Sequence, residues 1–265
     1  MNMPNSLQQK IAAGEATLGT HFLSTDPDVP EMIGDTGLFD YAEFCAEYAL
    51  FDMPMLAHLA RAGQAGNLPL VIKLDQACQE FWAQAAIGAG FHGVLFTDIR
   101  SAADVAAAYA AIRPDLPGTP GRMGIKIRRS ALSGYADAEY AEALESVVLM
   151  IMIEKAAAVD DLGAILDAAA ELGVAMVQWG PVDFALSCGR PGLVDTDEMR
   201  SVEERVITQS IEHGLLPRVE IADPEDAYRY VDLGVRHFCV GWDRFIYRSE
   251  LKRLGRGMRA ILGDV

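Results

Sequence analysis

One unit recurs along this chain of 265 residues: a helical segment rich in alanine or charge, then a glycine, then a short β-branched or aromatic run. A glycine in that place caps a helix in the left-handed conformation, and the run after it has the composition of a strand. The examples are TGLFDYAEF from Thr36, AGFHGVLF from Ala89, LGVAMVQWG from Leu172, HGLLPRVEIA from His213 and LGVRHFCVGW from Leu233. The repetition is typical of the helix-to-strand connections of a parallel sheet.

Three more strands are expected, which brings the total to eight. They are TLGTHFL from Thr17, LPLVIKLD from Leu68 and VVLMIMIE from Val147. Helical segments such as CQEFWAQAAIGAG and SAADVAAAYAAI separate the strands, and no G-x-G-x-x-G motif follows the first strand. This pattern favours a closed barrel over an open doubly wound sheet. We therefore predict an α/β protein with a single (β/α)8 TIM barrel domain over residues 1–265.

The charge balance restricts the partners that the chain can have. It carries 38 acidic and 22 basic residues, a net charge of −16, and nucleic-acid binding relies on Lys and Arg to neutralise phosphates. We expect no nucleic-acid partner. We also expect no membrane partner, because charges interrupt every apolar run before the roughly 18 residues that a membrane span needs. The segment MNMPNSLQQKIAAGE lacks the basic-then-apolar order of a secretory signal, so we expect a cytoplasmic protein.

The cysteines and the long connections give two smaller expectations. Four cysteines lie far apart without metal-type spacing and should be reduced thiols. They are Cys45, Cys78, Cys188 and Cys239. Two stretches, Pro114 to Tyr140 and Pro181 to Asp197, exceed ordinary loop length, and such loops are usually functional or lie at an interface.

The chemistry of such a barrel lies at the carboxyl ends of its strands. The polar residues there are His21, Glu47, Tyr48, Lys73, Asp75, Thr97, Asp98, Glu154, Lys155, Gln178, Asp183, Arg218, Glu220, Trp242 and Asp243. Glu154 and Asp183 each follow an apolar strand, where a lone carboxylate is costly unless a cation balances it. Two carboxylates with open positions suit Mg²⁺ or Mn²⁺. The alternative is that each carboxylate pairs with Lys or Arg, or caps a helix.

The segment GPVDF adds a possible substrate site beside these carboxylates. Gly180 lets a ligand approach the backbone, and the amides that follow Pro181, beginning at Val182, could hold a substrate carboxylate next to the metal. The alternative is an ordinary turn between a strand and a loop.

These residues resemble those of the HpcH/HpaI class II aldolases of 2-oxo acids, the family that includes 4-hydroxy-2-oxoheptanedioate aldolase. The most specific segments are IEKAAAVDDLGAIL and MVQWGPVDFALSCG, which resemble the family's I-E-T-x-x-A-x-x-N-x-x-x-I and G-P-x-D-L-S motifs in order and spacing. The resemblance implies that Glu154 and Asp183 bind a divalent metal, Mg²⁺, Mn²⁺ or Co²⁺, and that a 2-oxo acid chelates it. The implied activity is that of a lyase.

The implied reaction cleaves a 4-hydroxy-2-oxo acid into pyruvate or a related 2-oxo acid and an aldehyde, through a metal-bound enolate. A decarboxylase or condensing enzyme that uses the same enolate, and a non-catalytic barrel that binds a small acid, are the alternatives. The resemblance also implies a homo-oligomer, plausibly a hexamer, in which the carboxyl-terminal helix over residues 243–262 crosses a subunit boundary. Packing of that helix on its own barrel is the alternative.

Several family positions are altered in this chain. The family's D-x-E-H after the second strand is Cys45-Ala46-Glu47-Tyr48, so a tyrosine replaces the expected histidine base. The strand-three arginine becomes Ile72, or Lys73 with a one-residue slip. The other changes are Ala86 for an aspartate, Met152 for a glutamine and His21 for a tryptophan. The metal ligands match the family, whereas the groups for proton transfer differ.

Three routes for proton transfer remain open from the sequence. Tyr48 acts as a base only if its pKa falls, and otherwise fills the space of the missing imidazole. His21 titrates in the useful range and could act through a metal-bound water, although a lone histidine at a strand end more often has a structural role. We favour a metal-bound hydroxide assisted by His21 and Glu47. Arg128 and Arg129 either reach a distal substrate carboxylate or lie at an interface, and we slightly prefer the interface.

Overall fold

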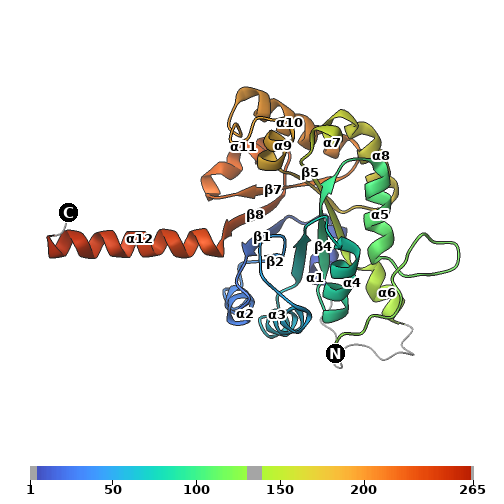
Figure 1. Cartoon of the computed structure of the whole chain (residues 1–265), viewed down its shortest axis with the longest axis horizontal. Helices are drawn as coiled ribbons and strands as arrows, with labels where there is room; N and C mark the ends of the chain where they lie inside the picture. Colours follow the sequence, from blue (N-terminus) through green and yellow to red (C-terminus); the bar gives the residue numbers. More distant parts are fainter. Residues whose placement is uncertain (1–4, 130–138, 264–265) are drawn as a thin grey trace.

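The computed structural model describes residues 5–129 and 139–263 of the chain. In this part of the chain, eight parallel strands close into a barrel in sequence order, and helices surround it (Figure 1). The strands are β1 (Thr17–Phe22), β2 (Tyr41–Cys45), β3 (Leu70–Leu74), β4 (Gly93–Ile99), β5 (Val148–Ile153), β6 (Met176–Trp179), β7 (Leu216–Ile221) and β8 (His237–Trp242). The prediction of a (β/α)8 TIM barrel is confirmed.

The helices follow the strands as the sequence pattern predicts. They are α1 (Ser6–Ala12), α2 (Asp28–Asp35), α3 (Met53–Ala65), α4 (Gln79–Ala89), α5 (Ala102–Ile112), α6 (Glu139–Glu145), α7 (Ala156–Asp160), α8 (Leu162–Glu171), α9 (Pro181–Ser187), α10 (Asp197–Glu212), α11 (Ala227–Asp232) and α12 (Asp243–Leu262), with a 3₁₀ turn at Pro224–Asp226. Among the described residues, no helix is both long and apolar enough to span a membrane.

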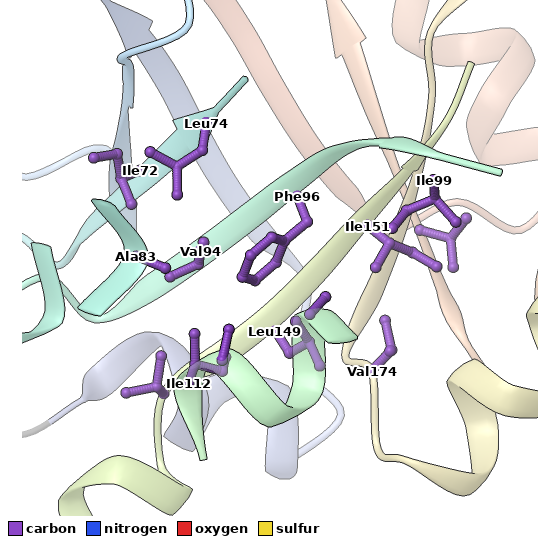
Figure 2. Close-up of a cluster of buried hydrophobic side chains, with 14 of the residues drawn as sticks. Ile72, Leu74, Ala83, Val94, Phe96, Ile99, Ile112, Leu149, Ile151 and Val174 are labelled. Atoms are coloured by element: carbon purple, nitrogen blue, oxygen red, sulfur yellow. The ribbon is translucent and has the colours of Figure 1, made fainter. Parts of the chain in front are cut away.

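Alternate residues of each strand face the helices and form the main core. Figure 2 shows this layer around β3, β4 and β5, where apolar side chains of the strands meet those of the neighbouring helices. The labelled residues are Ile72, Leu74, Ala83, Val94, Phe96, Ile99, Ile112, Leu149, Ile151 and Val174. Each large side chain buried here contributes roughly 1.5–3 kcal/mol to stability. The period of two along a strand then directs the intervening residues into the barrel.

The interior of the barrel changes from apolar to polar along its axis. Near the amino ends of the strands it holds Val71, Leu95, Met150 and other apolar side chains. Tyr41 fits inside because β1 offers Gly19, where an added Cβ would lie 2.2 Å from the ring of Tyr41. Toward the carboxyl ends, the inward positions carry charged and amide groups. The fold therefore brings polar residues of many strands together at one end.

The carboxyl-terminal helix α12 leaves the barrel and projects away from it, as Figure 1 shows in red. None of its 20 residues is buried. The apolar side chains that the sequence singles out on it are all exposed. They are Phe245, Ile246, Leu251, Leu254, Met258 and Ile261. The helix does not lie along its own barrel, so that alternative is wrong for the chain in this conformation.

Of the two stretches predicted as long loops, one begins with a helix. Residues from Pro181 form α9, because Pro181 occupies a first-turn position, where a missing N–H costs nothing. The prediction of a continuous loop from Pro181 to Asp197 is wrong in this part. In the other stretch, residues 130–138 lie outside the described part of the chain.

Arg129, which ends the described part of that stretch, is buried against its own chain. Its Nη1 donates to the carbonyl of Ala89 at 3.1 Å and its Nη2 to Oε1 of Gln64 at 2.8 Å. Both partners precede strands, so Arg129 lies at the amino ends of the strands, opposite the polar end of the barrel. It does not reach a substrate carboxylate at that end.

Candidate active site

A pocket of about 1080 Å³ opens at the carboxyl ends of the strands. Seven of the residues that the sequence assigns to the site line it. They are Tyr48, Lys73, Glu154, Gly180, Pro181, Val182 and Asp183. His21 and Glu47 do not line the pocket, but each contacts a residue that does. The carboxyl ends of the barrel strands thus bring the predicted residues to one place.

Glu154 is the buried carboxylate of this pocket. It directly follows β5, and the alternation along that strand directs it inward after Met150 and Met152, so that only 3% of its surface is exposed. Its Oε1 accepts a hydrogen bond from the backbone N–H of Asp98 at 2.8 Å. Burial raises the pKa of Glu154 to about 7, although the Asp98 amide and the charge of Lys73 oppose the rise. The carboxylate is therefore short of positive charge.

Gly180 gives Glu154 the space that its carboxylate occupies. An added Cβ at Gly180 would lie 2.6 Å from Cβ and 2.7 Å from Oε2 of Glu154. Real Cβ atoms do not approach that closely, so a side chain at position 180 would displace Glu154. Gly180 therefore has a specific packing role next to the carboxylate, beyond that of an ordinary turn residue.

Asp183 reaches the same pocket from the first turn of α9. Its Oδ1 lies 2.8 Å from the Nζ of Lys155, and the same ammonium lies 2.6 Å from Oδ1 of Asp98. Asp98 has a left-handed backbone with φ of 60°, which is uncommon outside glycine and often marks functional positions. A sequence search for carboxylates at strand ends includes Asp98 but does not reveal that it shares Lys155 with Asp183.

The donor set at this end fits a hard divalent cation. Glu154 and Asp183 supply oxygen ligands and line one pocket, and the charge of Asp183 adds to the rise in the pKa of Glu154. Such oxygens are the ligands that Mg²⁺ and Mn²⁺ prefer. The sequence left open that each carboxylate pairs with Lys or Arg instead of a metal. Asp183 does pair with Lys155, although it also lines the pocket.

Lys73, and not Ile72, faces the pocket from β3. Ile72 packs in the core between sheet and helices, whereas the Nζ of Lys73 lies 2.7 Å from Oε2 of Glu47 and 3.4 Å from the hydroxyl of Tyr48. Burial would lower the pKa of Lys73, but Glu47 and Tyr48 more than offset this and raise it. Lys73 is therefore a fixed positive charge in the pocket. Of the two residues that could replace the family's strand-three arginine, Ile72 and Lys73, it is the one that faces the pocket.

Tyr48 carries a phenol that keeps its proton. Burial raises its pKa above 10, and Glu47 adds to the rise, while Lys73 opposes it. The ring lies beside Trp242, with centroids 5.8 Å apart, and half of the residue is exposed. A phenol with a raised pKa stays protonated at neutral pH, so it can donate a hydrogen bond but is neither a base nor a good proton donor.

His21 lies behind the pocket wall and is 2% exposed. Its Nδ1 is 3.5 Å from Oε1 of Glu220 and its Nε2 is 3.4 Å from Oε1 of Glu43. Burial would lower the pKa of His21, but Cys239, Glu220 and Glu43 more than offset burial and raise it well above 6.5. The imidazole therefore holds a proton at neutral pH, and Glu220 lies between it and the pocket.

A buried ion pair in the barrel interior is the main feature that sequence reasoning missed. Glu43 and Arg218 are both fully buried, and Oε2 of Glu43 lies 2.6 Å from Nη2 of Arg218. Arg218 also donates to the hydroxyl of Tyr41 at 2.7 Å and to the side-chain oxygen of Gln178. Burial alone would raise the pKa of Glu43, but Arg218 and His21 lower it to about 2. A glutamate in the middle of the otherwise apolar strand YAEFC was the available signal.

His21, Glu43 and Cys45 also place possible metal-ligating atoms within 4.8 Å of one another. These three groups do not fit a metal ion well. Glu43 already pairs with Arg218, whose Nη2 is also 3.5 Å from Nε2 of His21, and burial raises the pKa of the Cys45 thiol. A metal would meet a guanidinium and two groups that hold their protons, so we interpret the cluster as a polar network.

Known proteins resemble this chain over nearly its whole length. The family model described as HpcH/HpaI aldolase/citrate lyase matches residues 47–249. A hydroxypyruvate/pyruvate aldolase of Agrobacterium fabrum is 26% identical over 251 residues, which cover 94% of this chain and 92% of the relative. A 2-keto-3-deoxy-L-rhamnonate aldolase of Salmonella gallinarum is 24% identical and covers 94% of this chain and 91% of its own.

Solved structures share the barrel. The citrate synthase SbnG superposes with a TM-score of 0.83 at 21% identity, over 98% of this chain and all of its own. An HpcH/HpaI aldolase from Desulfitobacterium hafniense gives 0.82 at 19% identity, over 96% of each chain. At these identities the structural likeness supports the fold.

Proposed function

Because the chain belongs to the HpcH/HpaI aldolase/citrate lyase family, we propose that it is a metal-dependent aldolase, a carbon–carbon lyase. The substrate would be a 4-hydroxy-2-oxo acid, cleaved to pyruvate or a related 2-oxo acid and an aldehyde. The relatives named as hydroxypyruvate/pyruvate aldolase and 2-keto-3-deoxy-L-rhamnonate aldolase support this reaction class. The observation that carries the proposal is the buried carboxylate of Glu154, which shares one pocket with Asp183 and is short of positive charge.

Glu154 and Asp183 would hold the divalent cation, Mg²⁺, Mn²⁺ or Co²⁺. When bound there, the cation would act as a Lewis acid that stabilises the negative charge of the enolate released by cleavage. Gly180 keeps the space for Glu154, and Gly180, Pro181 and Val182 form the wall against which the substrate carboxylate would lie.

Lys73 would add a second positive charge to the same pocket, from the end of β3. Its ammonium is fixed by Glu47 at 2.7 Å and contacts Tyr48, so it can face developing negative charge without moving far. Glu47 in this role positions Lys73. This assignment compensates for the strand-three arginine that the chain lacks.

The proton would move through groups that the structure leaves in defined protonation states. The raised pKa of His21 keeps the imidazole protonated at neutral pH, so it can supply a proton, whereas the raised pKa of Tyr48 leaves a phenol that can donate a hydrogen bond to a substrate oxygen. The carboxylate of Glu220 lines the pocket, and its Oε1 lies 3.5 Å from Nδ1 of His21, which also contacts the carbonyl of Gly241 at 3.2 Å. A proton on Nδ1 would have to turn from that carbonyl toward Glu220 to reach the pocket. We therefore assign proton transfer to His21 acting through Glu220, with Tyr48 as a hydrogen-bond donor to the substrate.

The test is the exchange of the pyruvate methyl protons with deuterium, which NMR monitors. The buffer contains Mg²⁺ and no Mn²⁺. An aldolase of this type forms the enolate and must catalyse exchange, whereas a barrel that only binds small acids does not. Exhaustive removal of metal with EDTA should abolish the exchange. Glu154→Gln and Asp183→Asn should abolish it while the circular dichroism spectrum stays unchanged. Full exchange after EDTA treatment would contradict the proposal.

A further inference from the structure

Lys155 places an ammonium group on the carboxylates of the candidate metal site. It directly follows Glu154, and its Nζ lies 2.8 Å from Oδ1 of Asp183 and 2.6 Å from Oδ1 of Asp98. Only 8% of the residue is exposed. The proposed ligand Asp183 therefore already has a cationic partner that belongs to the chain itself.

Asp98 is fixed in the position that allows this pairing. Its backbone N–H donates to Oε1 of Glu154 at 2.8 Å, and the register between β4 and β5 shifts between Phe96 and Ile99. The left-handed backbone of Asp98 costs free energy, so the surrounding contacts must maintain it. Asp98 thus gives Lys155 a second carboxylate that does not depend on Asp183.

We propose that Lys155 is an internal competitor that weakens divalent-cation binding at Glu154 and Asp183, and that Asp98 retains the ammonium when Asp183 turns to the metal. The inference rests on the proposed metal site. A divalent cation shared by Glu154 and Asp183 would lie close to the ammonium, and like charges repel more strongly where burial lowers the effective dielectric constant. Pairing with Asp98 reduces the cost of this displacement, because the ammonium keeps one carboxylate partner.

Removing the charge of Lys155 should strengthen metal binding. We expect Lys155→Met to bind Mn²⁺ at least about tenfold more tightly than the parent chain in isothermal titration calorimetry. Lys155→Gln provides a second neutral variant, and Lys155→Arg, which keeps the charge, should stay within a few-fold of the parent. Lys10→Met is the matched control, because Lys10 also pairs with a carboxylate, Asp40, at 2.5 Å but lies outside the pocket lining.

Removing the second carboxylate should have the opposite effect. With Asp98→Asn, the ammonium has only Asp183 as a partner, so Mn²⁺ should bind more weakly than in the parent. In the double variant Lys155→Met with Asp98→Asn, the ammonium of Lys155 is absent and Asp98 has no competitor to retain, so the affinity should equal that of Lys155→Met alone. A double variant that binds more weakly than Lys155→Met would instead make Asp98 a metal ligand and overturn this part of the proposal.

The outcomes separate this inference from the proposed function. If the parent binds Mn²⁺ and Glu154→Gln does not, the metal site stands. Neutral variants at Lys155 that then bind no more tightly than the parent would overturn the role of Lys155. If neither the parent nor the neutral variants bind Mn²⁺, the metal site and the inference both fail. Thermal unfolding of each variant checks that the barrel remains folded.

Discussion

The buried ion pair between Glu43 and Arg218 yields a stability prediction that can be worked out from the structure. Arg218→Met removes the guanidinium but leaves the carboxylate of Glu43, which is fully buried. Breaking a buried pair in this way costs about 3–5 kcal/mol, because the remaining carboxylate loses its nearest cation and keeps only one cationic contact, His21, whose Nε2 lies 3.4 Å from its Oε1. The lowered pKa of Glu43, about 2 instead of 4.5, shows the same direction: Arg218, His21 and Lys73 together favour the charged carboxylate by more than burial opposes it.

The assay is equilibrium unfolding in urea at about pH 7.5, followed by far-ultraviolet circular dichroism. We expect Arg218→Met to lose about 3–5 kcal/mol, and the double variant with Glu43→Gln to recover part of this loss, because no unpaired charge then remains. Arg122→Met is the control. Arg122 pairs with Glu80 at 2.9 Å, but both side chains are about half exposed, so its loss should stay within about 1 kcal/mol.

The pH dependence provides a second check on the same pair. In the parent chain the pKa of Glu43 is lowered, so its contribution to stability is complete above 4.5 and disappears as the pH falls toward about 2. The parent should therefore keep this contribution between about pH 7.5 and pH 5. In Arg218→Met the buried carboxylate loses the largest of its cationic contributions and takes up a proton more easily, so the stability deficit of the variant should shrink over that range. A deficit that is absent at neutral pH, or a double variant as unstable as the single one, would refute the reasoning.

Three further predictions concern the site and the assembly. Tyr48→Phe should reduce kcat only modestly, because the raised pKa of Tyr48 makes it a poor base. His21→Asn should reduce kcat by about a hundredfold with little change in Mn²⁺ affinity. Steady-state kinetics that reversed this order would assign the proton transfer to Tyr48. Gly180→Ala should weaken Mn²⁺ binding by about tenfold in calorimetry while the fold is kept, because the Cβ of the alanine would lie 2.7 Å from Oε2 of Glu154. Unchanged affinity would show that the carboxylate has room to move. The exposed apolar side chains of α12 should be covered in a homo-oligomer, plausibly a hexamer, so light scattering at micromolar concentration should show an assembly, and a monomer with α12 intact would contradict this expectation.

The sequence predicted the barrel and the pocket because both follow from short-range patterns. Glycine caps before β-branched runs mark each strand, and parallel strands in a barrel bring their carboxyl ends together. Glu154 and Asp183 could be placed in one pocket on that basis alone. Side chains alternate along β3, so only one of Ile72 and Lys73 can face the pocket. Which of them does so becomes clear only when the barrel interior has been located.

The contacts between distant residues could not be predicted in this way. Lys155 is adjacent to Glu154 in sequence, yet its pairing with Asp98 and Asp183 depends on the backbone shift at the end of β4. Likewise, nothing local to Glu43 indicates that Arg218 faces it across the barrel. The protonation states of His21 and Tyr48 depend on burial and on these partners, so the choice of base could not be made from residue types alone.

The Glu43–Arg218 pair also bears on the order in which the barrel assembles. It joins β2 to β7, and the neighbouring bond from Arg218 to Tyr41 spans 177 residues of chain. Loop closure over such a separation costs entropy before any contact compensates for it, so this pair can form only when the two ends of the sheet meet. Interactions that form after the rate-limiting step leave the folding rate almost unchanged and slow unfolding instead. If barrel closure follows the rate-limiting step of folding, the charges inside the barrel chiefly slow unfolding, and so they determine how long the closed barrel persists once it has formed.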